Sequence, residues 1–157
     1  MKLKADFDMS EWKRMAEGMI NRANLPTGYL GRVVYPEILN IQGRRWATEN
    51  ASQGDQWIPI MPDYARRKLR RYQSYPGGGR KLLVATDTLR QAMTNTKGGT
   101  GDKYHHRILT NREVGFYITV PYAGFVDKVR DITSLTKQQI DGFAKGFAKY
   151  ITSGNIK

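Results

Sequence analysis

The chain contains no cysteine. This absence excludes disulfides, thiolate metal sites and cysteine nucleophiles from the printed sequence. Long apolar runs are also missing, because no window approaches the roughly eighteen apolar residues that a membrane helix needs. The N-terminal stretch MKLKADFDMS has no apolar segment of the kind that signal peptides carry. We therefore expect a soluble protein without an export signal.

Groups for acid–base chemistry are scarce. The only 2 histidines, His105 and His106, are adjacent. Adjacent residues of a strand point to opposite faces, so these two cannot converge on one metal or one nucleophile. Two pairs of carboxylates are close in sequence, Asp6 with Asp8 and Asp127 with Asp131. Neither pair has a third ligand at a recognisable spacing, and solvation at the surface explains them better. We expect no enzyme activity, no metal site and no cofactor.

The run Gly77 to Gly79, followed by Arg80 and Lys81, looks faintly like a phosphate-binding loop. It lacks the Walker spacing of a glycine, four residues and then Gly-Lys-Ser/Thr. It also precedes a strand-like run, whereas a Walker loop opens a helix. The run therefore gives little support for nucleotide binding.

Acidic residues are few: 14 Asp and Glu stand against 26 Lys and Arg, which gives a net charge of +12. Such a charge attracts polyanions but says nothing about the fold. It fits a nucleic-acid binder, a protein that works close to nucleic acid, or a subunit that docks on acidic protein surfaces. The densest charge is a basic excursion without any acidic residue: Arg66, Arg67, Lys68, Arg70, Arg71, Arg80 and Lys81.

Tyr72 and Tyr75 lie among these cations. Interleaved Arg and Tyr can hold a phosphate backbone and stack on bases. The other interpretation is a solvated basic helix and loop that become ordered against a neighbour, and the sequence leaves both open. Residues 72–81 and 94–103 are rich in glycine, which predicts two mobile loops.

The N-terminal region predicts a strand and a helix. Alternating polarity over Leu3–Phe7 is typical of a short strand. Asp8 and Glu11 have the spacing of a capping box. From Trp12 to Ala23 apolar residues recur at three- and four-residue steps, which predicts a helix with a stripe that faces the core. The segment Asn24–Gly31, with its proline and glycines, ends this helix.

Two further amphipathic helices are predicted. The second runs from about Pro36 to Ala47, because proline suits a first helical turn and an apolar face follows it. The third follows a capping box of Thr136 with Gln139 and carries a regular apolar stripe. Gly142 and Gly146 lie four apart on another face of this helix, where they either allow a close neighbour or are simply tolerated.

The middle of the chain predicts mixed structure. Trp57–Pro62 is stiffened by prolines and reads as extended. Asp63–Arg71 can form a helix of about two turns that is basic on most sides. Leu82–Ala85 is an apolar, strand-like run. Thr86 can then cap a short helix over Asp87–Met93 that buries its apolar side chains.

A hairpin follows, with strands over Tyr104–Leu109 and Glu113–Val120 and a tight turn in which Asn111 can take a positive φ. These elements predict an α+β fold: a small antiparallel sheet packed against an N-terminal and a C-terminal amphipathic helix, with long flexible loops. Residues 1–157 are enough for one domain with a real core.

The chain has the segment GDQWIPIMPDYARRK, then a basic loop, then the segment KLLVATDTLRQAM, then a hairpin. This order resembles the tailed-phage virion morphogenesis family, the Mu G-like tail completion proteins. That family has a Gly-x-x-Trp-x-Pro segment, a basic helix, a variable loop, an Ile-Leu-x-x-Thr-Gly-x-Leu-Arg segment, a hairpin and a Tyr-Ala pair. The resemblance runs from Trp46 onward. The matching positions are Gly54, Trp57, Pro59, Tyr64, Lys68, Leu82, Leu83, Thr86, Leu89, Arg90, Tyr122, Ala123 and Phe125.

The chain also departs from that pattern. Asp87 and Thr88 replace the Gly-x pair, and Met61 stands where serine is usual. The glycine expected after Phe125 is replaced by Asp127 or its neighbours. These departures bear on local turn geometry.

The resemblance implies a structural subunit that catalyses nothing. It would assemble with copies of itself into a ring, expected to be a hexamer, at the head-proximal end of the tail or in the neck. The implied partners are the tail tube protein and the head connector or adaptor proteins. The implied location is the virion, and the host cytoplasm during assembly. In a ring around a DNA passage, the basic loop would face the channel and contact genomic DNA without sequence preference, or face a neighbouring subunit.

A free-standing basic nucleic-acid-binding protein is the alternative hypothesis. It predicts a DNA affinity that falls steeply with salt. It also predicts that this affinity is lost when Arg66, Arg67, Arg70 and Arg71 are all replaced by alanine.

Overall fold

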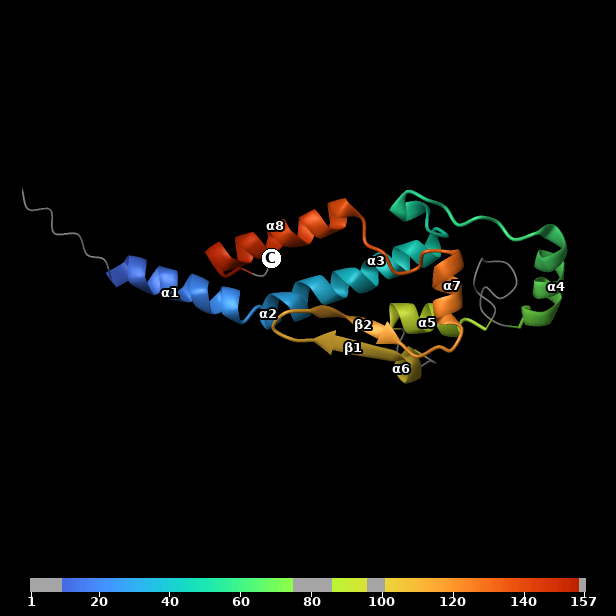
Figure 1. The fold of residues 1–157 in the computed structure, drawn as a ribbon, viewed down its shortest axis with the longest axis horizontal. Coiled ribbons are helices and arrows are strands. Elements are labelled where there is room, and N and C mark those ends of the chain that lie inside the picture. The colour runs from blue at the N-terminus through green and yellow to red at the C-terminus, as the bar shows by residue number, and fades with distance from the viewer. Residues whose placement is uncertain (1–9, 75–85, 96–100, 156–157) are drawn as a thin grey trace, which may run out of the picture.

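A computed structural model describes residues 10–74, 86–95 and 101–155. Together they form an elongated molecule with α1 at one end and α4 at the other (Figure 1). Its first elements are α1 (Ser10–Asn24), α2 (Thr27–Tyr29), the π-helix η1 (Leu30–Val34), α3 (Tyr35–Ala47) and the 3-10 turn η2 (Ala51–Gln53). Then follow α4 (Pro62–Tyr72), α5 (Thr88–Thr94), α6 (Gly101–Tyr104), β1 (His105–Leu109), β2 (Val114–Ile118), α7 (Ala123–Val129) and α8 (Lys137–Ser153). The α+β class is confirmed.

Several predicted segments lie outside the described residues. They are the strand at 3–7, the Asp8 cap, the strand-like run at 82–85 and most of the two glycine-rich loops. The ends of the second loop are helical, because α5 extends to Thr94 and α6 begins at Gly101.

The second helix starts earlier than predicted, since α2, η1 and α3 follow one another without a break from Thr27 to Ala47. Pro36 lies inside this run and has no N–H to donate, so the helical ladder is interrupted there. The wider π-turns of η1 lie directly before it. Ile41 and Arg45 are buried, which confirms the predicted inner face of this helix.

The sheet is one antiparallel hairpin, in which His105 pairs with Ile118 and Leu109 pairs with Val114. The Thr110 N–H donates to the Glu113 carbonyl at 2.9 Å. The Thr110 hydroxyl accepts from the N–H groups of Arg112 and Glu113, at 3.2 and 3.1 Å. Because this side chain holds the turn, no left-handed residue is needed, and the prediction of a positive φ for Asn111 is wrong.

The sheet packs mainly on η1 and α3, whereas α1 packs on α8. The predicted packing of the sheet against the two terminal helices is therefore not what the fold shows. The reason is that the long run from Thr27 to Ala47 passes between them, with the hairpin on one side and α8 on the other (Figure 1).

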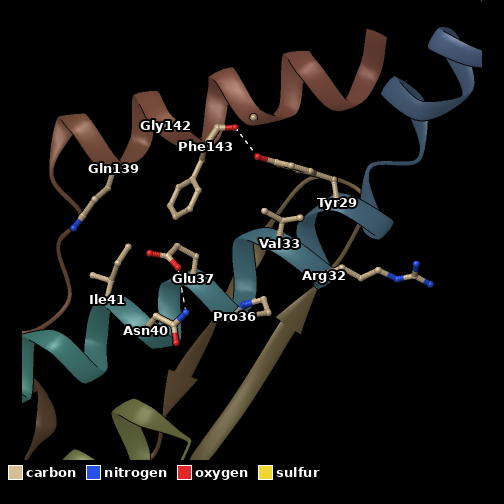
Figure 2. A pocket seen from close by; sticks show the side chains of 11 residues that line it. Tyr29, Arg32, Val33, Pro36, Glu37, Asn40, Ile41, Gln139, Gly142 and Phe143 are labelled. Carbon is tan, nitrogen blue, oxygen red and sulfur yellow. Dashed lines mark hydrogen bonds between the residues drawn. The ribbon is translucent and has the colours of Figure 1, made fainter. Parts of the chain in front are cut away.

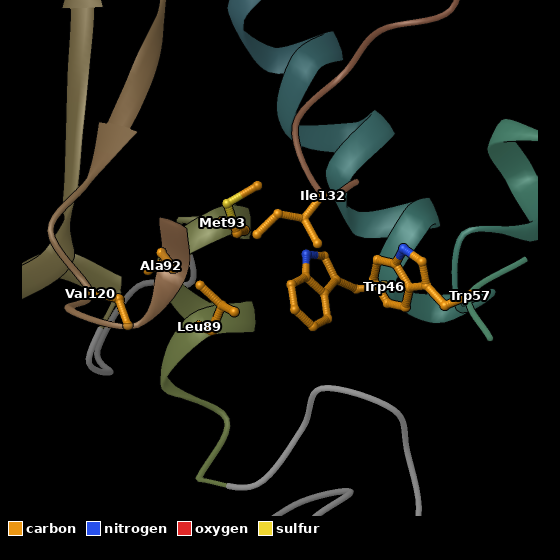
Figure 3. Close-up of a cluster of buried hydrophobic side chains, with 8 residues drawn as sticks. Trp46, Trp57, Leu89, Ala92, Met93, Val120 and Ile132 are labelled. Atoms are coloured by element: carbon orange, nitrogen blue, oxygen red, sulfur yellow. The ribbon is translucent and has the colours of Figure 1, made fainter. Parts of the chain in front are cut away.

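The hydrophobic core lies where α3, α5 and α7 meet (Figure 3). Trp46 and Trp57 are in edge-to-face contact, with ring centroids 5.1 Å apart. Beside them lie Leu89 and Met93 of α5, whose predicted burial is confirmed, and Ile132. Val120, Ala92 and Ala123 complete the cluster.

The apolar stripe of α1 does not face the core. No residue of α1 is buried, and Trp12 is 56 % exposed, Met15 47 % and Ile20 57 %. Helix α1 is instead tied to α8 near its own end, where the Arg22 Nε donates to the Ile151 carbonyl at 2.8 Å. The prediction of a core-facing stripe was wrong, because the part of the chain that the structure describes places nothing over most of this face.

Helix α8 begins as predicted, since the Thr136–Gln139 capping box is present with both of its hydrogen bonds. Its stripe is at most half-buried and rests on Tyr29 of α2. The Tyr29 ring stacks on Tyr150 and lies tilted against Phe147, and the ring centroids are 5.5 Å apart in both pairs. The Tyr29 hydroxyl donates to the Phe143 carbonyl at 3.1 Å. Gly146 lies against the Tyr29 hydroxyl, so this glycine does allow a close neighbour.

Replacing Gly146 with alanine is expected to lower the free energy of unfolding by about 1–3 kcal/mol, because the added methyl group would overlap the Tyr29 hydroxyl. Gly142 is the matched control: it lies in the same helix and a Cβ there would meet nothing within 4 Å. Gly142→Ala should raise the stability by up to about 1 kcal/mol. Urea titration measures both, and a loss of equal size in the two variants would contradict the contact with Tyr29.

Candidate functional site

The basic excursion falls largely on α4. This helix begins with Pro62, Asp63 lies in its first turn, and Arg70 and Arg71 lie in its last turn. That order suits the helix dipole, which favours negative charge at the N-terminus and positive charge at the C-terminus. The arginines Arg66, Arg67, Arg70 and Arg71 are all exposed. Arg80 and Lys81 lie outside the described residues.

Lys68 differs from the arginines around it, because it is buried. Burial lowers the pKa of Lys68, the carboxylate of Glu49 opposes this shift, and the charge of Arg130 adds to it. The side chain therefore faces the body of the molecule. Its prediction as a surface contact for DNA or a neighbouring subunit is corrected, since a buried ammonium cannot reach an external partner.

Five residues of α4 line a shallow hollow of about 240 Å³: Tyr64, Arg67, Lys68, Arg71 and Tyr72. The spacing of three and four residues places them on one face of the helix. The Arg71 guanidinium lies over the Tyr72 ring, 5.5 Å from its centroid, in a cation–π contact. Arg66 lies on another face and pairs with the Asp63 carboxylate.

A second hollow, of about 570 Å³, lies between α3 and α8 (Figure 2). Its floor is mostly apolar and includes Val33, Pro36, Ile41 and Phe143. The absent side chain of Gly142 leaves room on the α8 side. Polar groups of Arg32, Glu37, Asn40 and Gln139 contribute to the lining. We call this hollow the α3–α8 groove.

His105 and His106 are separated as predicted, because they lie on opposite faces of β1. The buried His105 ring lies between the Tyr35 hydroxyl at its Nε2 and the Ala92 carbonyl at its Nδ1, each 2.7 Å away. A carbonyl can only accept, so Nδ1 carries the proton and Nε2 accepts from Tyr35. His106 stacks on Tyr117 at a centroid distance of 4.7 Å. Both contacts of His105 are structural.

Burial lowers the pKa of His105, the hydrogen bond to the Ala92 carbonyl opposes this, and His106 adds to the lowering. The unfolded chain therefore binds the proton first, near the ordinary value of about 6.5. The free energy of unfolding should be constant above about pH 6.5 and should fall as the pH drops below it. Chemical denaturation between pH 8 and pH 5 measures this.

His105→Gln should flatten that pH dependence, and His106→Gln, the matched control on the other face of β1, should keep it. Equal pH profiles for all three proteins would contradict the structural role of the neutral His105 ring.

The residues of the family pattern divide into buried and exposed positions. Trp57, Leu89 and Ala123 are in the core, and Gly54 has a φ of 102° that glycine tolerates best. Pro59, Tyr64, Thr86, Tyr122 and Phe125 are exposed. Leu82 and Leu83 lie outside the described residues. The pattern therefore contains both packing residues and surface residues.

Asp87 stands where the family pattern has glycine, and its φ of 67° is left-handed. The buried Asp87 carboxylate accepts from Arg90 Nε at 2.5 Å, forms an ion pair with the same guanidinium, and accepts from the Gln91 side-chain amide. Asp87, and not Thr86, is the residue that precedes α5, and it makes no side-chain cap bond. The turn keeps a geometry that favours glycine, because aspartate tolerates this conformation and Arg90 holds the carboxylate.

We did not predict from the sequence that Asp127 and Asp131 accept hydrogen bonds in the loop between α7 and α8. Asp127 accepts from the Ile132 N–H at 3.1 Å, and Asp131 accepts from the N–H groups of Thr133 and Ser134 at 3.0 and 2.9 Å. Burial acts to raise the pKa of Asp131, and the bonds from Ser134 and Thr133 outweigh it and lower the pKa. These carboxylates are turn acceptors, not merely solvated groups. The run of Asp, Thr and Ser over residues 131–134 is typical of such turns and could have predicted this one.

Nothing in the described parts of the chain gathers three or more of His, Asp and Glu around a point that could hold a metal ion. Among the helices of residues 10–74, 86–95 and 101–155, each is too short or too polar to cross a membrane. Comparison with protein-family models, curated proteins and solved structures finds no match to this chain.

Proposed function

We propose that this protein is a structural assembly subunit of a tailed phage or prophage virion. It forms a ring with copies of itself at the head-proximal end of the tail or in the neck, where it completes the tail and joins it to the head connector. The structural observation that carries the self-assembly is the apolar face of α1, most of which no described residue covers. The sequence pattern from Gly54 to Ala123 supplies the virion context.

The face of α1 is costly to leave in water. Trp12, Met15 and Ile20 are all about half-exposed or more, and burying a large apolar side chain is worth about 1.5–3 kcal/mol. Exposed apolar patches mark interaction sites in soluble proteins. Helix α1 also extends away from the body (Figure 1), so it can reach a neighbouring subunit.

A ring needs two different surfaces on each subunit, because its contacts run head to tail. The stripe of α1 is one such surface, and the α3–α8 groove is a second. The groove has an apolar floor and is hollowed at Gly142, which suits an apolar helix face. We assign the α1 stripe of one subunit to the groove of the next.

The turn at Asp87 supports the family context. The resemblance has glycine at this position, and the chain adopts a backbone conformation there that favours glycine, although the residue is aspartate. The departure in sequence is therefore compatible with a turn that favours glycine. No catalytic role is part of the proposal.

Size-exclusion chromatography with light scattering, followed by negative-stain imaging, tests the assembly. The parent protein should form closed rings at high concentration, and the Trp12→Ser, Met15→Ser variant should remain monomeric. Arg14→Ser with Glu17→Ser is the matched control, because both residues are exposed on the opposite face of α1 and the net charge is unchanged. This control should still assemble.

Pull-down with a tail tube protein and a head connector protein tests the virion role. A parent protein that stays strictly monomeric and binds neither partner would overturn the proposed function. Equal assembly of both α1 variants would overturn the role of the stripe.

A further inference from the structure

The exposed cations of α4 are not equivalent. Arg66 is paired with Asp63, whereas neither Arg67 nor Arg71 forms an ion pair with any carboxylate in the described part of the chain. Arg67 and Arg71 are one helical turn apart, so their guanidinium groups are neighbours on one face. This face carries two positive charges that no carboxylate of residues 10–74, 86–95 and 101–155 neutralises by a direct ion pair.

The surroundings of these two arginines form a site rather than a simple solvated edge. Tyr64, which is 53 % exposed, and Tyr72 line the hollow together with Arg67 and Arg71. Lys68 lines the same hollow and is buried, so one edge of this face lies against the body. Helix α4 lies at the end of the molecule opposite α1 (Figure 1), and Arg67 and Arg71 are exposed on it.

The chemistry of the hollow fits phosphate. A guanidinium offers paired donors that match two phosphate oxygens, and tyrosine hydroxyls are common donors to the nucleic-acid backbone. Among the residues that the structure describes, the lining consists of tyrosines and cations, without an aliphatic side chain. Protein interfaces have an apolar centre depleted in charge, whereas interfaces with nucleic acid are polar and strongly positive. The lining therefore favours nucleic acid over an acidic protein surface.

The arrangement of the aromatic rings favours duplex over single strand. Single strands are held by bases that stack on exposed aromatic faces. The Tyr72 ring is covered on one face by the Arg71 guanidinium and is only half-exposed, so it is a poor platform for a base. Contacts to the outside of a duplex need only the guanidinium and hydroxyl groups.

We propose that the α4 face formed by Tyr64, Arg67, Arg71 and Tyr72 binds the sugar–phosphate backbone of duplex DNA without sequence preference. This contact goes beyond the proposed assembly role and does not depend on it. In a subunit that surrounds a DNA passage, such a face would hold the duplex at the wall. In a free subunit it would bind any duplex.

Fluorescence anisotropy with a labelled random-sequence duplex, measured on the full chain over a range of salt concentrations, tests the site. The Arg67→Ala, Arg71→Ala variant should bind about tenfold more weakly at low salt. Its slope of log affinity against log salt should be shallower by about 1.8, which is 0.9 for each lost phosphate contact. Arg66→Ala with Arg70→Ala removes the same formal charge from another face of α4 and should change the slope much less.

Four outcomes would overturn the site. Equal losses of DNA affinity in the two double variants would show that only the total charge of the protein attracts DNA. No loss of affinity in either variant would show that α4 does not contact DNA. Tighter binding of a single strand, lost in Tyr64→Ala but kept in Tyr64→Phe, would show base stacking. Equal affinity for polyglutamate would show an acidic protein partner. Thermal unfolding followed by circular dichroism checks that each variant is folded.

The same assay separates this proposal from the assembly role. The monomeric α1 variant, Trp12→Ser with Met15→Ser, keeps the α4 face and should bind an isolated duplex with the single-subunit affinity. Binding by that variant with no rings in the parent protein would leave the DNA site standing and overturn the ring. Rings in the parent protein without DNA binding would overturn the DNA site and leave the ring standing.

Discussion

Replacing Trp57 with alanine is expected to lower the free energy of unfolding by about 3–5 kcal/mol. Trp57 is 4 % exposed and joins the segment before α4 to the core. Its ring meets Trp46 edge to face, and its Nε1 donates to the Asp131 carbonyl at 3.0 Å. The substitution removes the ring, leaves a cavity and leaves that carbonyl without its donor.

Two variants separate these contributions. Trp57→Phe keeps most of the ring and loses the hydrogen bond, so its loss should be about 1–2 kcal/mol. Ile58→Ala is the matched control, because the neighbouring side chain is 76 % exposed and should change the stability by less than about 0.5 kcal/mol. Urea titration measures all three. A loss below about 1 kcal/mol for Trp57→Ala would contradict the position of Trp57 in the core.

Arg45 should give stability changes of opposite sign for two substitutions. Arg45 is fully buried in α3, and only Nη2 has a hydrogen bond, to the Ser134 carbonyl. Nε and Nη1 are buried without a partner among the residues that the structure describes. Burial lowers the pKa of Arg45, and the charges of Asp131 and Asp127 oppose this without a direct ion pair.

Arg45→Met fills a similar volume without the unpaired donors, so it should raise the free energy of unfolding by about 1–4 kcal/mol. Asp127 and Asp131 keep their hydrogen bonds from the loop, although the charge of Arg45 contributes to the lowered pKa of Asp131. Arg45→Ala leaves a cavity at a fully buried position of α3 and should lower the free energy of unfolding by about 2–5 kcal/mol. Chemical denaturation compares them. A large loss in both variants would show that the buried charge itself stabilises the fold.

Periodicity predicted where helices occur and which residues share a face. The faces of α3 and α5 and the start of α8 were predicted correctly, because caps and three- and four-residue spacing are local. The same periodicity could not show what covers a face. The stripes of α1 and α8 have the pattern of core helices, and only the arrangement of the whole chain reveals that α1 meets α8 just near Arg22.

The charge of the sequence located the candidate site on α4, but it did not show which of the cations are exposed. Lys68 and Arg67 are equivalent in a sequence of cations, and their roles differ because Lys68 is buried and Arg67 is exposed. The sequence also did not predict the left-handed conformation of Asp87, since aspartate indicates a positive φ less strongly than glycine does. Buried Arg45 gave no signal beyond its place on an apolar face.

The π-helix η1 has a consequence for insertions and deletions. A π-turn holds an extra residue relative to an α-turn, so Leu30–Val34 is where the helical run absorbs a change of length. Deleting one residue there would let the run become α-helical. Because the deletion removes the extra residue of the π-turn, Tyr29 and Tyr35 would keep nearly the same relative orientation, whereas a deletion from a regular α-helix rotates the residues on its two sides by about 100°. Tyr29 contacts α8 and Tyr35 contacts His105 of β1. A homologue one residue shorter here would therefore keep both contacts.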